Sequence, residues 1–343
     1  MDHNIINPKI TVLMPVYNCE LYIKEAIESI LNQTFSDFEF LIIDDASTDL
    51  TPSIIKSYND SRIKLIEKPD NSGYTNSLNY GLSIANGDYI ARMDGDDFSF
   101  PERFHKQISF LDSNRDVFLC GTSYRIMERD KNIILPESHE NIKSALLKAN
   151  CIVHPSVMFR NSRDNKSSVC YDSLKEPAED YDLWVRLLTF GKLYNLPEIL
   201  LNYRVHDSQV SQKRNDEQKN AALEVRLDLL NYLECAIDSK ERFVLKKALN
   251  DENLNYQEIK YFIILKNKLI ASNSNSFFEK NAFQKYLDSI EKKIFKDFFL
   301  KRDNYSPIIF FYYLKIRGNW KIKTKDEFKL LVKSLIFFKI KNE

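Results

Sequence analysis

Apolar and polar positions in roughly the first two hundred residues alternate between strand-like and helix-like patterns. Residues 9–16 (KITVLMPV) form a nearly continuous apolar run with β-branched side chains, which predicts a strand buried on both faces. In residues 20–33 the apolar side chains recur at positions i, i+3, i+4 and i+7. This spacing predicts a helix, and Asn18 is a suitable N-cap for it.

The same alternation continues through the next sixty or so positions. Residues 38–43 (FEFLII) predict a second strand, and residues 62–68 (RIKLIEK) predict a third. A helix is predicted from Thr75 to Asn86, with Gly87 as its C-terminal stop, and a fourth strand is predicted over 88–93. The resulting β-α-β-α-β order predicts an α/β fold with a mostly parallel sheet flanked by helices.

Polar clusters directly follow three of these strands. Tyr17-Asn18 follows the first, Asp44-Asp45 the second, and Asp94-Gly95-Asp96-Asp97 the fourth. Since parallel sheets bind ligands at the carboxyl ends of their strands, we expect a site there. We also expect Asp44 and Asp94 to lie side by side at neighbouring strand ends.

A change of pattern near residue 212 predicts two regions, 1–212 and 213–343. After Gly191 the only glycine is Gly318. Leucines recur at helical spacing at positions 223, 227, 230 and 233. We therefore expect the second region to be mainly helical.

Composition and charge narrow the class of protein. The chain is 43% hydrophobic and 29% charged, and no stretch approaches the roughly 18 to 20 apolar residues of a membrane span. The N-terminus lacks the pattern of a secretory signal, and five scattered cysteines form no C-x-x-C pair, so we expect a cytoplasmic protein with reduced thiols.

The balance of charge is uneven along the chain. Lys+Arg and Asp+Glu are both 49, but residues 291–343 hold 14 basic and 6 acidic side chains. A basic end on an acidic body indicates an anionic partner surface for that end and no nucleic acid along the protein.

Asp94-Gly95-Asp96 has the chemistry of a divalent-cation site. Two carboxylates on a turn, with a small residue between them, can both face Mg²⁺ or Mn²⁺, which prefer oxygen ligands and bridge carboxylates to diphosphates. The alternative is a solvated turn, which the same three residues also form.

Six motifs in order resemble the family 2 glycosyltransferases of the GT-A fold. They are PVYN (15–18), ESILNQTF (28–35), DDASTD (44–49), NSG (71–73), ARMDGDD (91–97) and AEDYDLW (178–184). The resemblance covers about residues 8–212. Residues 191–211 are similar to bacterial enzymes that extend lipooligosaccharide, O-antigen or capsule chains.

For the donor, a UDP-sugar, the resemblance implies that Tyr17 stacks near the uracil and that Asp44 accepts a hydrogen bond from uracil N3–H. Asn71 and Arg92 would help to hold the nucleoside and the catalytic turn. The alternatives are that Tyr17 is a packing residue, Asn71 a turn former and Arg92 a partner for Asp94.

For the metal, Mn²⁺ or Mg²⁺, the resemblance implies Asp96 as the direct ligand. Asp94 would contact the ribose or reach the metal through water, and Asp97 would cap the next segment. His206 would complete the metal shell, with Arg204 meeting phosphate charge. The alternative for His206 is a structural role, and His154 is a weaker candidate on the acceptor side.

For catalysis, the resemblance implies Asp180 as the base that removes the acceptor proton and Glu179 as a residue that orients acceptor or donor. In-line attack assisted by one base inverts the anomeric centre and gives a β linkage from an α-linked donor. The expected product is a hexose or N-acetylhexosamine added to a glycan or lipid-linked glycan.

Two other functions remain as alternatives. A nucleotidyltransferase would usually show a glycine-rich phosphate loop after the first strand, where this chain has PVYNCELY (15–22). A non-catalytic nucleotide-sugar-binding scaffold would not need Asp180.

The C-terminal region interleaves aromatic residues with lysines over 295–323. This mixture suits the inner face of an anionic membrane, where such a protein would be peripheral. A core helix with a solvated basic face is the alternative.

Overall fold

The computed structural model of the chain describes residues 7–161, 169–206, 209, 214–302, 304–316 and 324–339. The chain divides into two compact units, Met1–Arg226 and Leu227–Glu343. The division falls inside helix α8 (Asn215–Leu229), whereas the sequence predicts a boundary just before this helix.

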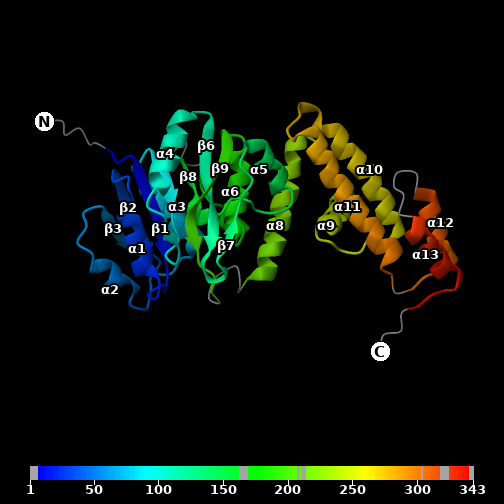
Figure 1. The fold of residues 1–343 in the computed structure, drawn as a ribbon, viewed down its shortest axis with the longest axis horizontal. Helices are drawn as coiled ribbons and strands as arrows, with labels where there is room; N and C mark the ends of the chain where they lie inside the picture. Colours follow the sequence, from blue (N-terminus) through cyan, green and yellow to red (C-terminus); the bar gives the residue numbers. More distant parts are fainter. Residues whose placement is uncertain are drawn as a thin grey trace. The chain divides into compact units, whose positions relative to one another are not determined.

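A single sheet organises the first unit (Figure 1). Among the described residues it has nine strands in the order β3-β2-β1-β4-β8-β6-β9-β5, with β7 paired to β6. The strands are β1 Ile10–Val16, β2 Phe38–Asp44, β3 Ile63–Glu67, β4 Tyr89–Arg92, β5 Phe98–Ser99, β6 Val117–Ile126, β7 Lys131–Ile133, β8 Met158–Arg160 and β9 Lys192–Tyr203.

Helices connect and cover these strands. In this unit they are α1 Ile23–Leu31, α2 Thr51–Lys56, α3 Tyr74–Ile84, α4 Arg103–Ser113, α5 His139–Leu146 and α6 Glu179–Leu187, followed by α8. Short 3₁₀ helices lie at Met127–Arg129, His154–Ser156 and Ser173–Lys175.

The strands β3, β2, β1 and β4 pair in parallel, as the β-α-β-α-β pattern predicts. The rest of the sheet is mixed, because β8 pairs antiparallel with both β4 and β6 while β9 runs parallel to β6. One expectation was wrong: β1 lies between β2 and β4, so Asp44 and Asp94 do not follow neighbouring strands.

The two faces of β1 are covered by different helices. Val12 and Met14 lie in one apolar cluster with Ile27 of α1 and Phe104 of α4. On the opposite face a Cβ on Gly81 of α3 would lie 2.2 Å from the Leu13 side chain. Burial on both faces explains the continuous apolar run, and each such buried side chain contributes roughly 1.5–3 kcal/mol.

Two predicted helix boundaries were wrong. Helix α1 begins at Ile23, and Asn18 instead has φ 50° and accepts a hydrogen bond from Thr48 N through Oδ1. Helix α3 ends at Ile84, before Gly87. Gly87 allows its own backbone to pack closely against that of Thr11, since a Cβ at position 87 would lie 2.2 Å from the backbone N of Thr11.

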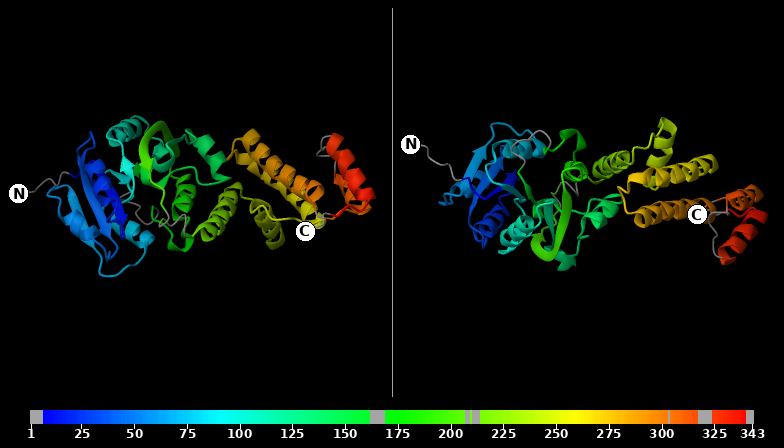
Figure 2. Two further views of the ribbon diagram at one scale, coloured as in Figure 1. Left: turned by 60° about the horizontal axis from the view of Figure 1, so that its bottom comes forward. Right: turned by 90° about the horizontal axis from the view of Figure 1, so that it is seen from above.

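The described part of the second unit is helical, as predicted. Its helices are α9 Ser239–Leu249, α10 Tyr256–Ser272, α11 Lys280–Leu300, α12 Pro307–Ile316 and α13 Thr324–Leu335. Capping boxes start α9 at Asp238 and α10 at Asn255. Figure 2 shows α10 and α11 side by side, and Lys266 of α10 forms ion pairs with Asp288 and Glu291 of α11.

The four leucines at helical spacing are all buried. Leu223 and Leu227 belong to α8, while Leu230 and Leu233 belong to a 3₁₀ turn that follows it. In the portions of the chain that the structure describes, no helix combines the length and apolar character that membrane crossing requires.

Candidate active site

The turn between β4 and β5 carries three carboxylates and is pressed against the end of β1. A Cβ on Gly95 would lie 3.0 Å from Val16 Cγ1 and 3.1 Å from Cys19 Sγ. A small residue is needed here because the turn packs directly on these side chains. That packing fixes the backbone from which Asp94 and Asp96 project.

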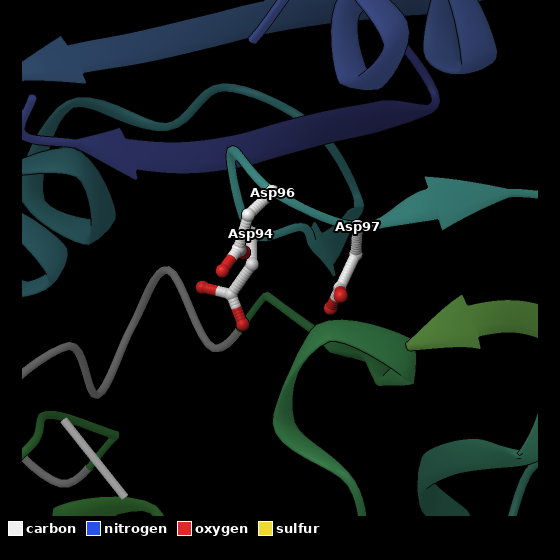
Figure 3. A group of neighbouring side chains, drawn as sticks. All are labelled: Asp94, Asp96 and Asp97. Carbon is white, nitrogen blue, oxygen red and sulfur yellow. The ribbon is translucent and has the colours of Figure 1, made fainter. Parts of the chain in front are cut away.

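The three carboxylates of this turn form a candidate metal site. Asp94, Asp96 and Asp97 each place one oxygen within 4.8 Å of the others. Figure 3 shows Asp94 and Asp96 side by side, with Asp97 directed to the same side of the turn. Burial, reinforced by the neighbouring carboxylates, raises the pKa of Asp97 well above its usual range.

These donors fit a hard divalent cation. All are carboxylate oxygens, and Oδ2 of Asp97 is buried without a hydrogen-bond partner among the described residues. Crowded carboxylates of this kind are costly unless a cation or protons neutralise them. The arrangement therefore suits Mn²⁺ or Mg²⁺.

Two side chains, those of Arg92 and Tyr74, donate hydrogen bonds to Asp94. Arg92 is buried and donates from Nη2 to Asp94 Oδ1 at 2.5 Å, while the Tyr74 hydroxyl donates to the same oxygen at 3.3 Å. The Arg92 guanidinium also lies over the Tyr74 ring at 5.2 Å. The alternative in which Arg92 is a partner for Asp94 is thus confirmed, and a role for Arg92 beside the donor stays a prediction.

Asp96 meets the segment that follows β9. Nε2 of His206 lies 2.8 Å from Asp96 Oδ2, and Gln209 Nε2 donates to that oxygen at 3.3 Å. The His206 ring also packs against the Tyr22 ring, with centroids 4.9 Å apart. The structure thereby brings His206 to Asp96, two of the residues that the sequence assigns to the metal.

Arg204 ties the same segment to the carboxylate turn. Its backbone N donates to Asp97 Oδ1 at 2.9 Å, and its Nε donates to the Asp96 carbonyl at 2.8 Å. Its Nη2 forms an ion pair with Glu25 at 2.5 Å. Asp97 therefore binds the end of β9, and the expected capping of the next segment was wrong.

Two residues that the sequence assigns to the nucleoside lie at the ends of β1 and β2. Asp44 is buried; Oδ2 accepts from Ser47 N at 3.2 Å, and Oδ1 has no hydrogen-bond partner among the described residues. An unpaired buried acceptor suits an N–H donor on a ligand. Tyr17 is 49% exposed, so the alternative of a packing residue was wrong.

The NSG loop is anchored by Asp45, to which the sequence assigns no separate role. Asp45 accepts from Lys68 Nζ at 2.6 Å and from the backbone N of Gly73 at 2.9 Å. Burial raises the pKa of Asp45, but the hydrogen bonds from Lys68 and from the backbone N of Ser72 outweigh it and lower the pKa overall. Asn71 Oδ1 accepts from Gly73 N at 3.2 Å, which confirms the turn-forming role.

Glu179 and Asp180 open helix α6 on the other side of the site. Burial, followed by the charge of Asp180, raises the pKa of Glu179 to about 8. Burial also raises the pKa of Asp180 to about 6, and the nearby charge of Asp94 acts in the same direction. Asp180 and the carboxylate turn therefore interact electrostatically.

His154 is enclosed by aromatic side chains. Its Nε2 lies 2.8 Å from the Tyr171 hydroxyl, and its ring lies 5.7 Å from that of Trp184. Burial lowers the pKa of His154 well below its usual range. This neutral, buried imidazole supports Tyr74 behind Asp94, with the hydroxyl 3.4 Å from Nδ1.

Three residues at the site escaped the sequence analysis: Tyr74, Asn150 and Gln209. Each contacts a predicted site residue, namely Asp94, Asp180 and Asp96 respectively. Tyr74 directly follows the NSG motif, which was a usable signal. The other two pairs are joined only by the folded chain, and no spacing rule links them.

Comparisons with known proteins decide the family. Residues 11–166 match the profile described as Glycosyl transferase family 2. The O-antigen biosynthesis glycosyltransferase WbnJ of Escherichia coli is 33% identical over 251 residues, which are 71% of this chain and 91% of WbnJ. This chain belongs to glycosyltransferase family 2.

Solved structures confirm the GT-A fold of this family 2 glycosyltransferase. S. aureus TarS 1–349, in complex with UDP-GlcNAc, matches with a TM-score of 0.56 at 16% identity, over 83% of this chain and 89% of TarS. The mannosyltransferase PcManGT of Pyrobaculum calidifontis, in complex with GDP-Man and Mn²⁺, matches with a TM-score of 0.51 at 16% identity, over 85% and 88%.

Proposed function

We propose that this family 2 glycosyltransferase transfers a hexose or N-acetylhexosamine from a UDP-sugar to a hydroxyl of a growing surface glycan, with inversion to a β linkage. One observation carries the proposal. The carboxylate turn is connected to helix α6, which carries Asp180: the Tyr74 hydroxyl donates to Asp94 and contacts His154, whose ring lies 5.7 Å from that of Trp184 in α6. The O-antigen function of WbnJ supports a surface-glycan acceptor.

The donor would be held at the ends of β1, β2 and β4. The unpaired Oδ1 of Asp44 suits uracil N3–H, and the exposed ring of Tyr17 suits the base face. Asn71 closes the turn beside them, and Arg92 fixes Asp94 toward the ribose. The UDP-GlcNAc complex of TarS supports a uridine donor.

Asp96, Asp94 and His206 would hold Mn²⁺ or Mg²⁺, and Arg204 keeps their backbone in place. When bound, the cation stabilises the negative charge that builds on the departing diphosphate. The Mn²⁺ in the PcManGT complex supports this assignment.

Asp180 would take the proton of the acceptor hydroxyl while its oxygen attacks the anomeric carbon. Glu179, buried and adjacent, would orient the sugar. Attack from the face opposite the diphosphate inverts the anomeric centre. NMR of the product should show a β linkage from an α-linked donor, and an α linkage would exclude this mechanism.

The central test is release of nucleoside diphosphate from a panel of UDP- and GDP-sugars with Mn²⁺. Wild type should turn over a UDP-hexose or UDP-N-acetylhexosamine. Asp180→Asn should lose about 100- to 10,000-fold in rate, the usual contribution of a general base. Undiminished turnover in Asp180→Asn would remove Asp180 from this role.

The second unit supports a further part of the proposal, binding to an anionic membrane surface. In α13 Leu330 and Ser334 are buried, whereas Phe328, Val332 and Leu335 are exposed at helical spacing. The same helix carries two exposed lysines, Lys325 and Lys329. Apolar side chains flanked by lysines match the chemistry of an anionic lipid surface.

A further inference from the structure

Two contacts bind the end of helix α5 to the start of helix α6. The hydroxyl of Tyr181, which is fully buried, donates to the carbonyl of Leu146. Asn150 donates from Nδ2 to Oδ2 of Asp180 at 2.8 Å. The segment after α5 therefore lies against the proposed base.

The orientation of the Asn150 amide follows from its hydrogen bonds. Oδ1 accepts from the backbone N of Ile152 at 3.1 Å, so Nδ2 is the atom that faces Asp180. The other carboxylate oxygen of Asp180, Oδ1, accepts from the backbone N of Tyr181 at 2.6 Å. With one donor on each oxygen, the plane of the carboxylate is fixed.

The Asn150 hydrogen bond also acts on the charge of Asp180. Burial raises the pKa of Asp180, the Asn150 amide lowers it, and Asp94 and Arg92 act in opposite directions. A hydrogen-bond donor to a carboxylate favours the anion, which is the form that a base requires.

Resting on the proposed function, we propose that Asn150 is the positioning residue that holds the Asp180 carboxylate in the orientation in which it takes the proton of the acceptor hydroxyl. The acceptor oxygen forms its bond to the anomeric carbon while its proton passes to Asp180. The bond from the anomeric carbon to the diphosphate breaks, and the electron pair leaves with the diphosphate.

The positioning role is tested by Asn150→Ser in the full chain. The Ser hydroxyl can still accept from Ile152 N, as in an ST-turn, but the shorter, uncharged side chain loses the donor to Asp180. In the absence of acceptor, hydrolysis of the UDP-sugar that wild type uses should fall about 10- to 100-fold in kcat, with the donor KM unchanged.

Asn150→Ala, which removes both hydrogen bonds, separates positioning from structure. If Asn150 only holds the backbone at Ile152, Asn150→Ala will be impaired and Asn150→Ser will match wild type, which overturns the inference. If Asp180→Asn is itself undiminished, the proposed function fails instead. An inactive Asp180→Asn with a fully active Asn150→Ser refutes the positioning role alone.

Discussion

Nε2 of His206 lies 2.8 Å from Oδ2 of Asp96, although 110 positions separate the two residues. The contact depends on β9, because Phe98 in β5, just after the carboxylate turn, pairs with Asn202 in β9, just before His206. One end of the sheet thus brings an imidazole to the carboxylates. An imidazole nitrogen and carboxylate oxygens can bind one divalent cation together.

Replacing His206 should therefore weaken metal binding without unfolding the domain. We expect His206→Ala to lower Mn²⁺ affinity about 10- to 100-fold, the effect typical of groups that hold or support metal ligands. Titration calorimetry with Mn²⁺ and UDP measures this directly. Asp96→Asn should lose more affinity than His206→Ala, and equal affinity of His206→Ala and wild type would place His206 outside the metal site.

The pH dependence of donor turnover should follow Asp180. Its pKa is raised to about 6 by burial, so the carboxylate is protonated and inactive as a base below that pH. We expect kcat/KM to rise as pH increases through about 6, with a tenfold change per unit on the acid side. The residual activity of Asp180→Asn should lack this acid limb; an identical limb would assign the titration to another group.

A methyl group at position 95 should disturb the carboxylate turn. The added Cβ of Gly95→Ala would crowd Val16 Cγ1 at 3.0 Å and Cys19 Sγ at 3.1 Å. We expect a loss of about 1–3 kcal/mol in unfolding free energy, as for other overpacked sites, together with a higher donor KM. Urea denaturation measures the unfolding free energy, and initial rates measure the donor KM.

The double variant Gly95→Ala with Cys19→Ala provides the control for this effect. Removing the sulfur relieves one of the two contacts, so the effects of the two substitutions on the free energy of unfolding should not be additive. Strict additivity would show that the sulfur contact is not the source of the loss.

Membrane binding should depend on the apolar stripe of α13. We expect wild type to sediment with vesicles of phosphatidylglycerol and not with vesicles of phosphatidylcholine, and added salt should weaken the binding. Leu335→Glu should abolish sedimentation. Ile264→Glu on α10 is the control, since Ile264 is 64% exposed and Leu335 is 61% exposed. This substitution should leave sedimentation unchanged.

Equal sedimentation of Leu335→Glu and wild type would show that this stripe does not contact lipid.

Local patterns were enough for most of the parallel half of the sheet. The apolar runs that became β1, β2 and β4 could be read directly, because strands buried on both faces admit few polar side chains. Helix caps were less predictable. Asn18 looks like an N-cap, but its side chain bonds Thr48 in the next loop, a partner that no local pattern identifies.

Sequence by itself determined the family resemblance and the residues at strand ends, because the strand period and the motifs are local properties of the chain. Only the tertiary structure decided which of these residues meet. In the folded sheet β1 lies between the strand that ends at Asp44 and the strand that precedes Asp94. The Asn150 side chain donates a hydrogen bond to Asp180. The physical reason is that strand order and side-chain hydrogen bonds depend on how distant segments pack, and packing is settled by the whole core at once.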